Sequence, residues 1–343
     1  ASELNEKLLL VRRRIERCYE TLLARQAAVT PALVREMYFG NDRQQETLLA
    51  FFRQHNEEFG RMVGVSRSKS SYYKYRSVYR LLAAYVRERC RRADIPFREL
   101  DKRFLAGFHQ YIARESPHKK NTAWVYMIAF KHILMLARSR DLLSADLFAG
   151  YRLRSEFVAR DYLTETEIRR LMLLAPTDRT QRLVLDAFLF SCFTGLSYID
   201  IRQLKPANIR YTQGQLWIGT TRRKTGSEVY VRLFAVPNAI LSRYLTDAAD
   251  EPIFALPSNG WCNACLRRLL PEAGIVRPIT FHVARHTFAT TITLSQGVAI
   301  ETISKLLGHR NIRTTQIYAA VTHAKLEGDM ERLSRQLDAC YRL

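Results

Sequence analysis

Two short stretches near the carboxy-terminal end of the sequence hold residues that could do chemistry together. In the first, His282 and Arg285 stand three positions apart, so on a helix they share one face. In the second, Tyr318 follows His309 by nine positions. Arginine binds an anionic group through paired hydrogen bonds, and imidazole exchanges protons near neutral pH. These residue types could bind an anionic group and exchange protons with it.

The residues between these side chains predict how they are held. Gly308 can end a helix in the left-handed conformation, which would present His309 from a turn. Tyr318 is then expected on a short helix that follows the turn. His286, which stands beside Arg285, is expected to support packing rather than chemistry.

The charge of the chain indicates the kind of partner. Its 343 residues include 54 Lys and Arg against 33 Asp and Glu, a formal net charge of +21. Such an excess favours a polyanion, and nucleic acid is the first candidate because basic side chains displace counterions from phosphates. A membrane-surface role is the alternative, but no strongly apolar face opposes a Lys-rich one. The most apolar stretch, residues 184–196, carries Asp186 and is too short to span a bilayer.

The cysteines give no sign of a disulfide framework or a metal site. All six are scattered along the chain, which fits a reducing cytoplasm. Cys262 and Cys265 look like half of a zinc site, yet no second pair has matching spacing. We interpret them as helix packing, and we expect no metal and no other cofactor.

Helical periodicity dominates the amino-terminal half. Residues 1–60 carry an apolar stripe, and Thr30-Pro31 starts a second helix. Residues 60–103 hold thirteen Lys and Arg against four Asp and Glu. Within them, Ser70 and Ser71 are expected to cap a helix. A helix start among basic side chains is a phosphate-binding arrangement, although a solvated charged face has the same composition. The basic residues around this start are Lys69, Lys74, Arg76 and Arg80.

We place the junction between two domains at residues 141–161, where helical periodicity fades. This gives an all-helical domain at 1–155 and a mixed domain at 156–343. Thr164, with Glu167 three residues later, predicts the capping box of the first helix in the mixed domain.

A small antiparallel sheet is predicted inside the mixed domain. Apolar and polar residues alternate in three segments separated by turn residues, at 208–211, 215–220 and 228–233. The final apolar stripe, from Leu326 to Tyr341, predicts an amphipathic helix that must pack on something. The predicted fold class is therefore mainly α with a small antiparallel β-sheet.

The two chemical stretches together resemble a known catalytic motif. Residues 282–290 read H-V-A-R-H-T-F-A-T, and L-G-H at 307–309 is followed by Tyr318. This pairing is similar to the catalytic domain of tyrosine recombinases, the phage-type integrases, over residues 160–330. The helical region 60–150 resembles, more loosely, the SAM-like core-binding domain of that family. The sequence as a whole resembles integrases of Bacteroides mobile elements, the conjugative transposons. The family resemblance implies that the two domains form a C-shaped clamp on DNA.

The resemblance implies a transesterification on a DNA phosphodiester. Tyr318 would attack phosphorus, leaving a 3′-phosphotyrosyl link and a free 5′-hydroxyl, without ATP or a metal. Arg285 would balance charge on the non-bridging oxygens. His282 and His309 would donate hydrogen bonds or move the proton. Lys224, in the turn between the second and third predicted strands, would protonate the leaving 5′-oxygen.

One position departs from the family pattern. Ser197 follows Thr-Gly-Leu where the family has a catalytic arginine, and a serine cannot neutralise a phosphate. Arg202, five residues on, and Arg160, before the capping box, are the candidates to replace it. Asp200 matches an acidic position that supports a neighbour rather than reacting. The alternative is a weakened recombinase that binds DNA as an accessory protein and does not cut it.

The implied partners are double-stranded DNA recombination sites and further copies of the chain. The family works as a tetramer in which each protomer lends its C-terminal helix to the next, and the stripe at 326–341 fits either that exchange or packing within the chain. The participation of a host DNA-bending protein and of an N-terminal arm-binding domain before Ala1 stays open. A type IB topoisomerase is a second rival, since it shares the tyrosine chemistry but acts as a monomer on any sequence. Phosphate contacts are expected from Lys69, Lys74, Arg76, Arg80, Lys119, Lys120, Arg222 and Arg223.

Overall fold

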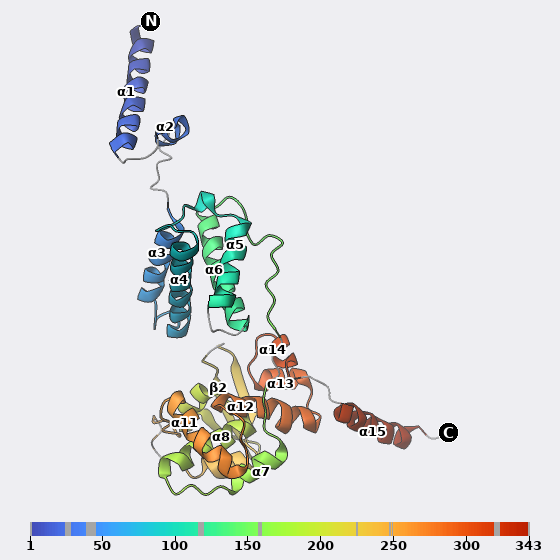
Figure 1. The fold of residues 1–343 in the computed structure, drawn as a ribbon. Coiled ribbons are helices and arrows are strands. Elements are labelled where there is room, and N and C mark those ends of the chain that lie inside the picture. Colours follow the sequence, from blue (N-terminus) through green and yellow to red (C-terminus); the bar gives the residue numbers. More distant parts are fainter. Residues whose placement is uncertain are drawn as a thin grey trace. The chain divides into compact units, whose positions relative to one another are not determined.

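The structure is a computed structural model, and it divides the chain into two compact units, Ala1–Phe157 and Val158–Leu343. Helices predominate, and one antiparallel sheet has three strands (Figure 1). The predicted fold class is confirmed. The residues that the structure describes are 2–24, 29–38, 46–115, 120–156, 160–223, 226–246, 248, 250–318 and 323–341.

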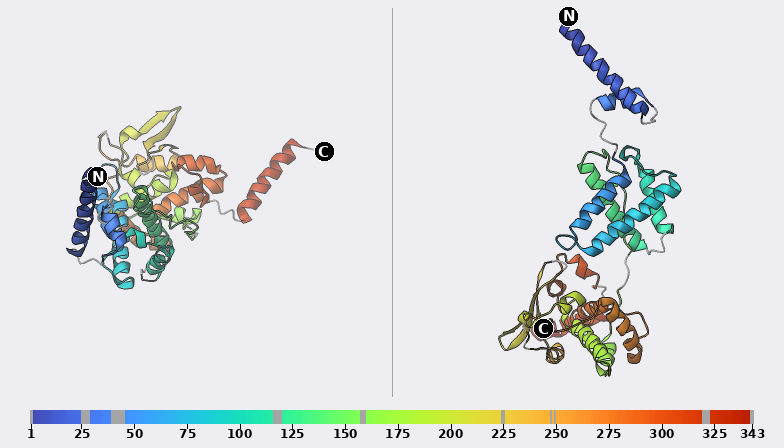
Figure 2. Two further views of the ribbon diagram at one scale, coloured as in Figure 1. Left: turned by 90° about the horizontal axis from the view of Figure 1, so that it is seen from above. Right: turned by 90° about the vertical axis from the view of Figure 1, so that its left-hand side faces the viewer.

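Helices make up the first unit. α1 (Ser2–Ala24) pairs with α2 (Pro31–Tyr38), which begins at the predicted proline. The next four helices lie side by side around one core (Figure 1, Figure 2); they are α3 (Leu48–Arg61), α4 (Lys69–Arg89), α5 (Lys102–Glu115) and α6 (Lys120–Ser139). A short 3-10 helix, η1 (Phe97–Glu99), precedes α5. The largest side chains fully buried in this core are Phe52, Phe108 and Phe130.

The start of α4 corrects one prediction. Its N-cap is Ser68 rather than Ser70 or Ser71, because the Ser68 hydroxyl accepts the backbone N–H of Ser71 at 3.2 Å. All three serines can cap a helix. A tight turn closes on the Met62 carbonyl and ends at Arg67, so Ser68 is the first serine free to begin the helix.

The second unit is built around a central helix. α8 (Arg179–Thr194) is buried along most of its length, which explains the apolar character of residues 184–196. Asp186 is tolerated there because its carboxylate accepts hydrogen bonds from Tyr244 at 2.8 Å and from Arg243 at 3.1 Å. Among the helices that contact α8 are α7 (Glu165–Leu173), α10 (Ala235–Leu241), α11 (Asn259–Leu269) and α12 (Phe281–Thr287).

The remaining helices of this unit are mostly short, apart from the terminal one. The π-helix η4 (Phe288–Thr293) continues α12, and η5 (Leu294–Gln296) continues η4. The others are α9 (Tyr198–Arg202), η2 (Pro206–Asn208), η3 (Leu270–Ala273), α13 (Ile300–Leu306), α14 (Arg313–Gln316) and the terminal α15 (His323–Cys340).

The sheet follows the predicted strands to within one residue at each end. Its order is β1 (Ile209–Thr212), β2 (Gln215–Thr221), β3 (Glu228–Arg232), with antiparallel pairing throughout. Gln213 and Gly214, which join the first two strands, both have positive φ (50° and 73°), as a two-residue type I′ turn requires. Arg222 follows β2 directly and pairs with Ser227 through its backbone N–H at 2.8 Å, so the sheet positions Arg222.

The predicted capping box at the start of α7 is confirmed. The Glu167 N–H donates to the Thr164 hydroxyl at 3.3 Å, and the Glu167 carboxylate accepts the Thr164 N–H at 2.8 Å. Arg277 also donates to this carboxylate, at 2.8 Å. The hydrogen bond from Arg277 is the main reason why the pKa of Glu167 falls to about 2. Glu167 therefore connects the start of α7 to the segment that leads into α12.

Candidate active site and nucleic-acid interface

Arg285 is fixed between the ends of two helices. It extends from α12 and is only 2% exposed. Its guanidinium donates to the Gly195 carbonyl, at the end of α8, at 2.5 Å, and to the Leu307 carbonyl at the end of α13. Helix ends present carbonyls with partial negative charge, so both contacts favour a cation. Burial, followed by the nearby Arg222, lowers the pKa of Arg285 to about 9, and the group stays protonated at neutral pH.

The predicted left-handed helix end at Gly308 is confirmed. Gly308 has a φ of +59°. Its N–H donates to the Lys305 carbonyl at 2.8 Å, and the His309 N–H donates to the Ser304 carbonyl at 3.0 Å, the two bonds of a Schellman motif. A Cβ at Gly308 would lie 2.7 Å from the Val229 side chain. The turn thus brings the end of α13 against the sheet.

Arg222 reaches the same helix end from the sheet. It follows β2 and is 8% exposed. Its guanidinium donates to the Leu307 carbonyl at 2.8 Å and to the Gly308 carbonyl at 3.4 Å. Burial lowers its pKa, and Asp200 opposes that shift. Two buried guanidinium groups, those of Arg222 and Arg285, therefore converge on one backbone carbonyl.

The Nε of Arg222 has no acceptor. Among the side chains that the structure describes, it is the buried polar atom that lacks a hydrogen-bond partner. A buried donor without an acceptor costs about 1–3 kcal/mol. An anionic oxygen beside this guanidinium would remove that cost.

Ser197 and Asp200 form a support for the turn that carries Arg222. Ser197 precedes α9, and its hydroxyl donates to the Asp200 carboxylate at 2.5 Å. The other carboxylate oxygen accepts the Arg223 N–H at 3.4 Å. The position where the family has an arginine is thus occupied by a serine that is bound to a neighbouring acid.

Tyr318 is buried beside α12. Its side chain is 8% exposed, and its hydroxyl oxygen lies 2.9 Å from Nδ1 of His286. Tyr318 was expected on a short helix, but α14 ends at Gln316, two residues before it. Burial raises the pKa of the Tyr318 hydroxyl, while Arg285, Arg222 and Arg160 oppose the rise.

Arg222, Arg285 and Tyr318 line one cavity of about 420 Å³. Four residues predicted to be catalytic are on its wall, and so is Arg160, whose side chain is exposed. Nδ1 of His309 lies 2.8 Å from the Thr315 hydroxyl, while His282 is exposed at the start of α12. The lining is Arg160, Arg222, His282, Arg285, His286, His309, Arg310, Asn311, Thr314, Ile317 and Tyr318.

Arg202 and Arg223, two of the residues predicted for the site, do not line this cavity. Arg202 is exposed on α9 beside Tyr198, so the structure does not bring it to the cavity. Arg223 is exposed next to Arg222 and contributes its backbone to Asp200. Lys224 lies outside the described residues. From the sequence, Arg222 was predicted only to contact DNA phosphates, and His286 was predicted only to support packing. No local pattern indicates that either side chain lines the cavity.

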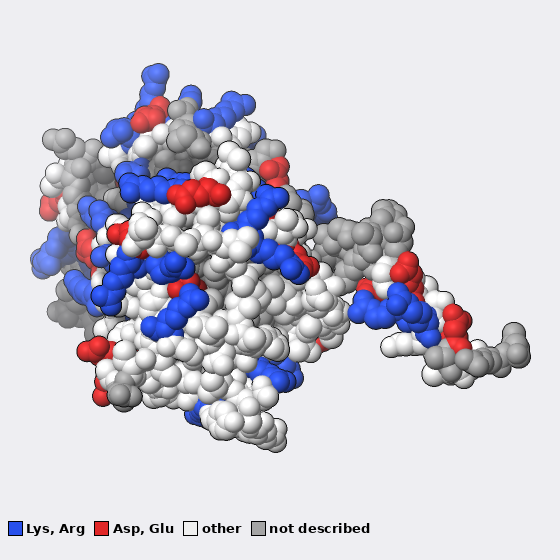
Figure 3. Space-filling view, turned by 90° about the horizontal axis from the view of Figure 1, so that it is seen from below, with Lys and Arg blue, Asp and Glu red and all other residues white. Residues whose placement is uncertain are grey.

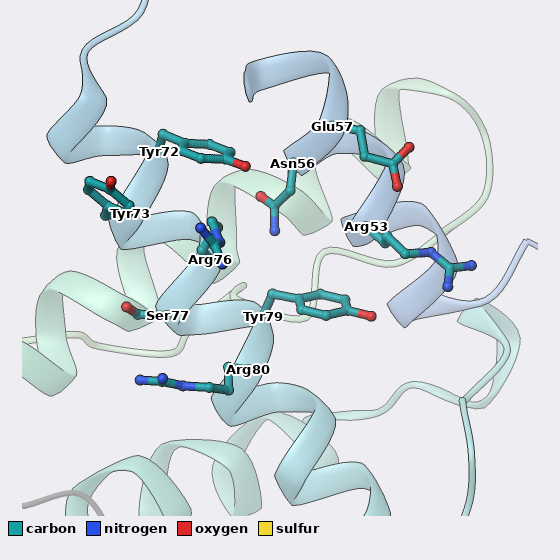
Figure 4. Close-up of a pocket in the computed structure, with 9 residues that line it drawn as sticks. All are labelled: Arg53, Asn56, Glu57, Tyr72, Tyr73, Arg76, Ser77, Tyr79 and Arg80. Carbon is teal, nitrogen blue, oxygen red and sulfur yellow. The ribbon is translucent and has the colours of Figure 1, made fainter. Parts of the chain in front are cut away.

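A second basic hollow lies between α3 and α4, in the first unit (Figure 4). It has a volume of about 490 Å³. Arg76 and Arg80, predicted from the sequence, are on its α4 side, and Arg53 joins them from α3. Asn56 is buried at its wall and turns its amide toward α4. The remaining lining residues are Glu57, Tyr72, Tyr73, Ser77 and Tyr79.

Lys69 and Lys74, the other basic contacts predicted on α4, do not line this hollow. Lys69 lies 6.0 Å from the centre of the Tyr73 ring, and Lys74 lies 5.1 Å from the Tyr75 ring, both as cation–π contacts. Lys119 lies outside the described residues, as does the side chain of Lys120. Basic side chains outnumber acidic ones on the face drawn in Figure 3, in keeping with the net charge of +21.

Two further observations bear on the class of site. The described part of the chain holds no group of three or more His, Cys, Asp or Glu side chains placed to bind a metal ion. Cys262 and Cys265 lie on the buried side of α11, as the packing interpretation predicted. Within the described ranges no helix has both the length and the apolar character to cross a bilayer.

Family models identify both units. The model of the phage integrase family matches residues 161–325, and that of the phage integrase SAM-like domain matches residues 47–153. The chain belongs to the phage integrase family of tyrosine recombinases.

Curated relatives and solved structures agree with this assignment. The tyrosine recombinase XerA of Pyrococcus furiosus is 30% identical over 185 residues, which cover 50% of this chain and 60% of that protein. XerD of Listeria monocytogenes is 45% identical over 149 residues, which cover 39% of this chain and 48% of that protein. The chain thus matches about three-fifths or less of the length of these relatives.

The fold is shared with integrases solved on DNA. A lambda integrase dimer bound to a core site superposes with a TM-score of 0.62 at 16% identity, covering 80% of this chain and 95% of that one. The Tn1549 transposon integrase with a circular intermediate DNA gives a TM-score of 0.63 at 15% identity, covering 83% and 99%. At such identities the likeness concerns the fold.

Proposed function

We propose that the chain is a site-specific DNA recombinase that cleaves and rejoins DNA through a covalent link to Tyr318. The observation that carries the proposal is the cavity where Tyr318, two buried arginines and three histidines meet. This arrangement supplies a nucleophile, fixed positive charge and proton carriers within one site.

The chemistry exchanges one phosphoester for another. The Tyr318 oxygen attacks phosphorus, the bond from phosphorus to the 5′-oxygen breaks, and a 3′-phosphotyrosyl link and a 5′-hydroxyl result. The 5′-hydroxyl of a partner strand then attacks that link and frees Tyr318. Because each step makes one phosphoester and breaks one, no ATP is required. Lys224 is the proposed donor of a proton to the leaving 5′-oxygen.

Arg222 is our candidate for the arginine absent at Ser197. Arg285 and Arg222 are both fixed by the Leu307 carbonyl before DNA arrives, so they can stabilise charge on the non-bridging oxygens without reorganising. Arg160 lines the cavity but is exposed, and Arg202 is not among the lining residues. In addition, the Nε of Arg222 has no hydrogen-bond acceptor, and a phosphate oxygen would supply one.

The hollow between α3 and α4 is proposed as a DNA contact of the first unit. Arg53, Arg76 and Arg80 would neutralise phosphates and so orient the duplex without reading its sequence. The terminal helix α15 leaves Met330, Leu333 and Leu337 at least 44% exposed, which supports exchange of this helix between protomers of a tetramer. Movement of a mobile element in the bacterial cytoplasm is the proposed setting, supported by the transposon integrase of similar fold.

Covalent capture tests the function. The protein is incubated with fragmented DNA from its source, denatured in detergent, and the DNA still attached to protein is recovered and sequenced. We expect a defined site joined to the wild-type protein and no adduct with Tyr318→Phe. Specific binding without an adduct would support an accessory protein instead, while adducts on any sequence, with relaxation of supercoils, would support a topoisomerase.

A further inference from the structure

The hydroxyl of the proposed nucleophile contacts a side chain that the mechanism above does not use. Nδ1 of His286 lies 2.9 Å from the Tyr318 oxygen, within hydrogen-bond distance. The two ring centres are 5.3 Å apart, and their planes are inclined by 54°. His286 is 6% exposed and Tyr318 is 8% exposed, so solvent competes little for this contact.

We propose that His286 is a further catalytic residue, which accepts the phenolic proton as Tyr318 attacks the DNA phosphate. The inference rests on the proposed function. The new bond joins the Tyr318 oxygen to phosphorus, and the bond from phosphorus to the 5′-oxygen breaks. The phenolic proton passes to Nδ1 of His286, while Lys224 protonates the leaving oxygen. In rejoining, His286 returns its proton to Tyr318.

The surroundings of His286 keep its imidazole neutral before DNA binds. Burial, and after it the adjacent His282, lower the pKa of His286 to about 4. The rings of His282 and His286 are 4.6 Å apart at 78°, on consecutive turns of α12. A neutral imidazole that carries its proton on Nε2 presents a lone pair at Nδ1, as an acceptor of the phenolic proton must.

Phosphate binding would strengthen His286 as a base. The charged and titratable groups that face it are Arg160, His282, Arg285, His309 and Tyr318. Two of these, Arg285 and His309, are proposed ligands of the DNA phosphate. An anion seated among them offsets the positive charge that disfavours the imidazolium. The arrival of the substrate would therefore raise the basicity of His286 at the moment when Tyr318 must lose its proton.

A substitution series separates proton acceptance from positioning. His286→Asn keeps an acceptor near the place of Nδ1 but takes up no proton, whereas His286→Phe removes the acceptor. The assay is single-turnover cleavage of the duplex recovered by covalent capture. We expect both variants to cleave about 100-fold more slowly or worse, the usual contribution of a general base. If His286 only holds the tyrosine, His286→Asn will cleave within a few-fold of wild type, and the proposal is overturned.

A modified substrate identifies which proton is affected. In a duplex with sulfur at the bridging 5′-position, the leaving thiolate needs no proton. We expect this substrate to restore cleavage by Lys224→Ala and not by His286→Asn. Restoration of both variants would place His286 on the leaving-group side and overturn the assignment.

The chain provides a matched control in its first unit. His109 of α5 makes the same type of contact, with Nδ1 2.8 Å from the Tyr151 oxygen. His109→Asn should leave cleavage unchanged. Thermal unfolding and DNA binding check that each variant is folded, and His286→Gln replaces an asparagine variant that is not. Failure of wild type to form any adduct would contradict the proposed function, whereas an active His286→Asn would contradict this inference alone.

Discussion

At the scale of single residues, the buried guanidinium groups of the site donate their hydrogen bonds to backbone carbonyls rather than to carboxylates. Arg222 and Arg285 come from distant parts of the sequence, and both donate to the Leu307 carbonyl. The Asp200 carboxylate accepts hydrogen bonds from the Ser197 hydroxyl and from the Arg223 N–H. A carbonyl holds a guanidinium without cancelling its charge. Both arginines therefore remain available to an incoming phosphate.

Arg222→Ala tests the second of these cations. We expect adduct formation to fall about 100-fold or more, because one fixed donor to the transition state is lost. Arg222→Lys should recover only part of the rate, since an ammonium cannot reproduce the paired geometry of a guanidinium. The measurement is single-turnover cleavage on the captured site, with Arg202→Ala as the control from outside the cavity. Equal losses in Arg222→Ala and Arg202→Ala would contradict the role given to Arg222.

At the scale of elements, the sequence predicts best what a few adjacent residues determine. The three strands of the sheet and the capping box at Thr164 and Glu167 follow from local patterns, and both are confirmed. The predicted N-cap of α4 was wrong because several nearby serines can cap a helix equally well. The turn that precedes the helix determines which of them does so. The partnership of Arg222 with Arg285 could not be predicted, because it depends on how α13 packs against β3.

The turn after α13 can be tested with Gly308→Ala. The positive φ and the 2.7 Å approach to Val229 make a Cβ unfavourable there. We expect a loss of about 1–3 kcal/mol in stability, together with slower cleavage because the Leu307 carbonyl moves. Gly260→Ala is the control, since a Cβ at Gly260 meets nothing within 4 Å. Denaturant titration and the cleavage assay report the two effects, and an unchanged Gly308→Ala on both would refute the argument.

The start of α7 makes stability depend on acid pH. The pKa of Glu167 is lower in the folded protein, about 2, than its ordinary value of 4.5. Its contribution is therefore complete above the unfolded pKa and is lost as pH falls from there toward 2. Glu167→Gln should cost about 2 kcal/mol at pH 7 and almost nothing near pH 2.

Unfolding in urea at several pH values measures this difference. Glu165→Gln is the matched control, because Glu165 makes only an exposed pair with Arg169, four residues on. A Glu167→Gln variant whose deficit stays constant with pH would show that the ion pair with Arg277 contributes nothing.

At the scale of the whole molecule, the net charge of +21 sets how salt affects DNA binding. Each phosphate neutralised by a basic side chain releases counterions, so affinity falls steeply with ionic strength. Arg76→Ala and Arg80→Ala should each reduce the slope of log affinity against log salt by about 1 and weaken binding on specific and nonspecific DNA alike. Fluorescence anisotropy over a salt series measures this slope, with Arg12→Ala, from an exposed pair on α1, as the comparison. Unchanged slopes would place the duplex elsewhere on the first unit.

The anchor shared by Arg222 and Arg285 has a consequence for how the site tolerates mutation. The Leu307 carbonyl belongs to the main chain, so no side-chain replacement at that position deletes it. A variant library should accept many apolar residues at 307 while rejecting nearly every change at 308, where the left-handed turn aims the carbonyl. Position 307 should thus tolerate substitution while its neighbour 308 does not. The distance between the two guanidinium groups is set by the one carbonyl to which both donate.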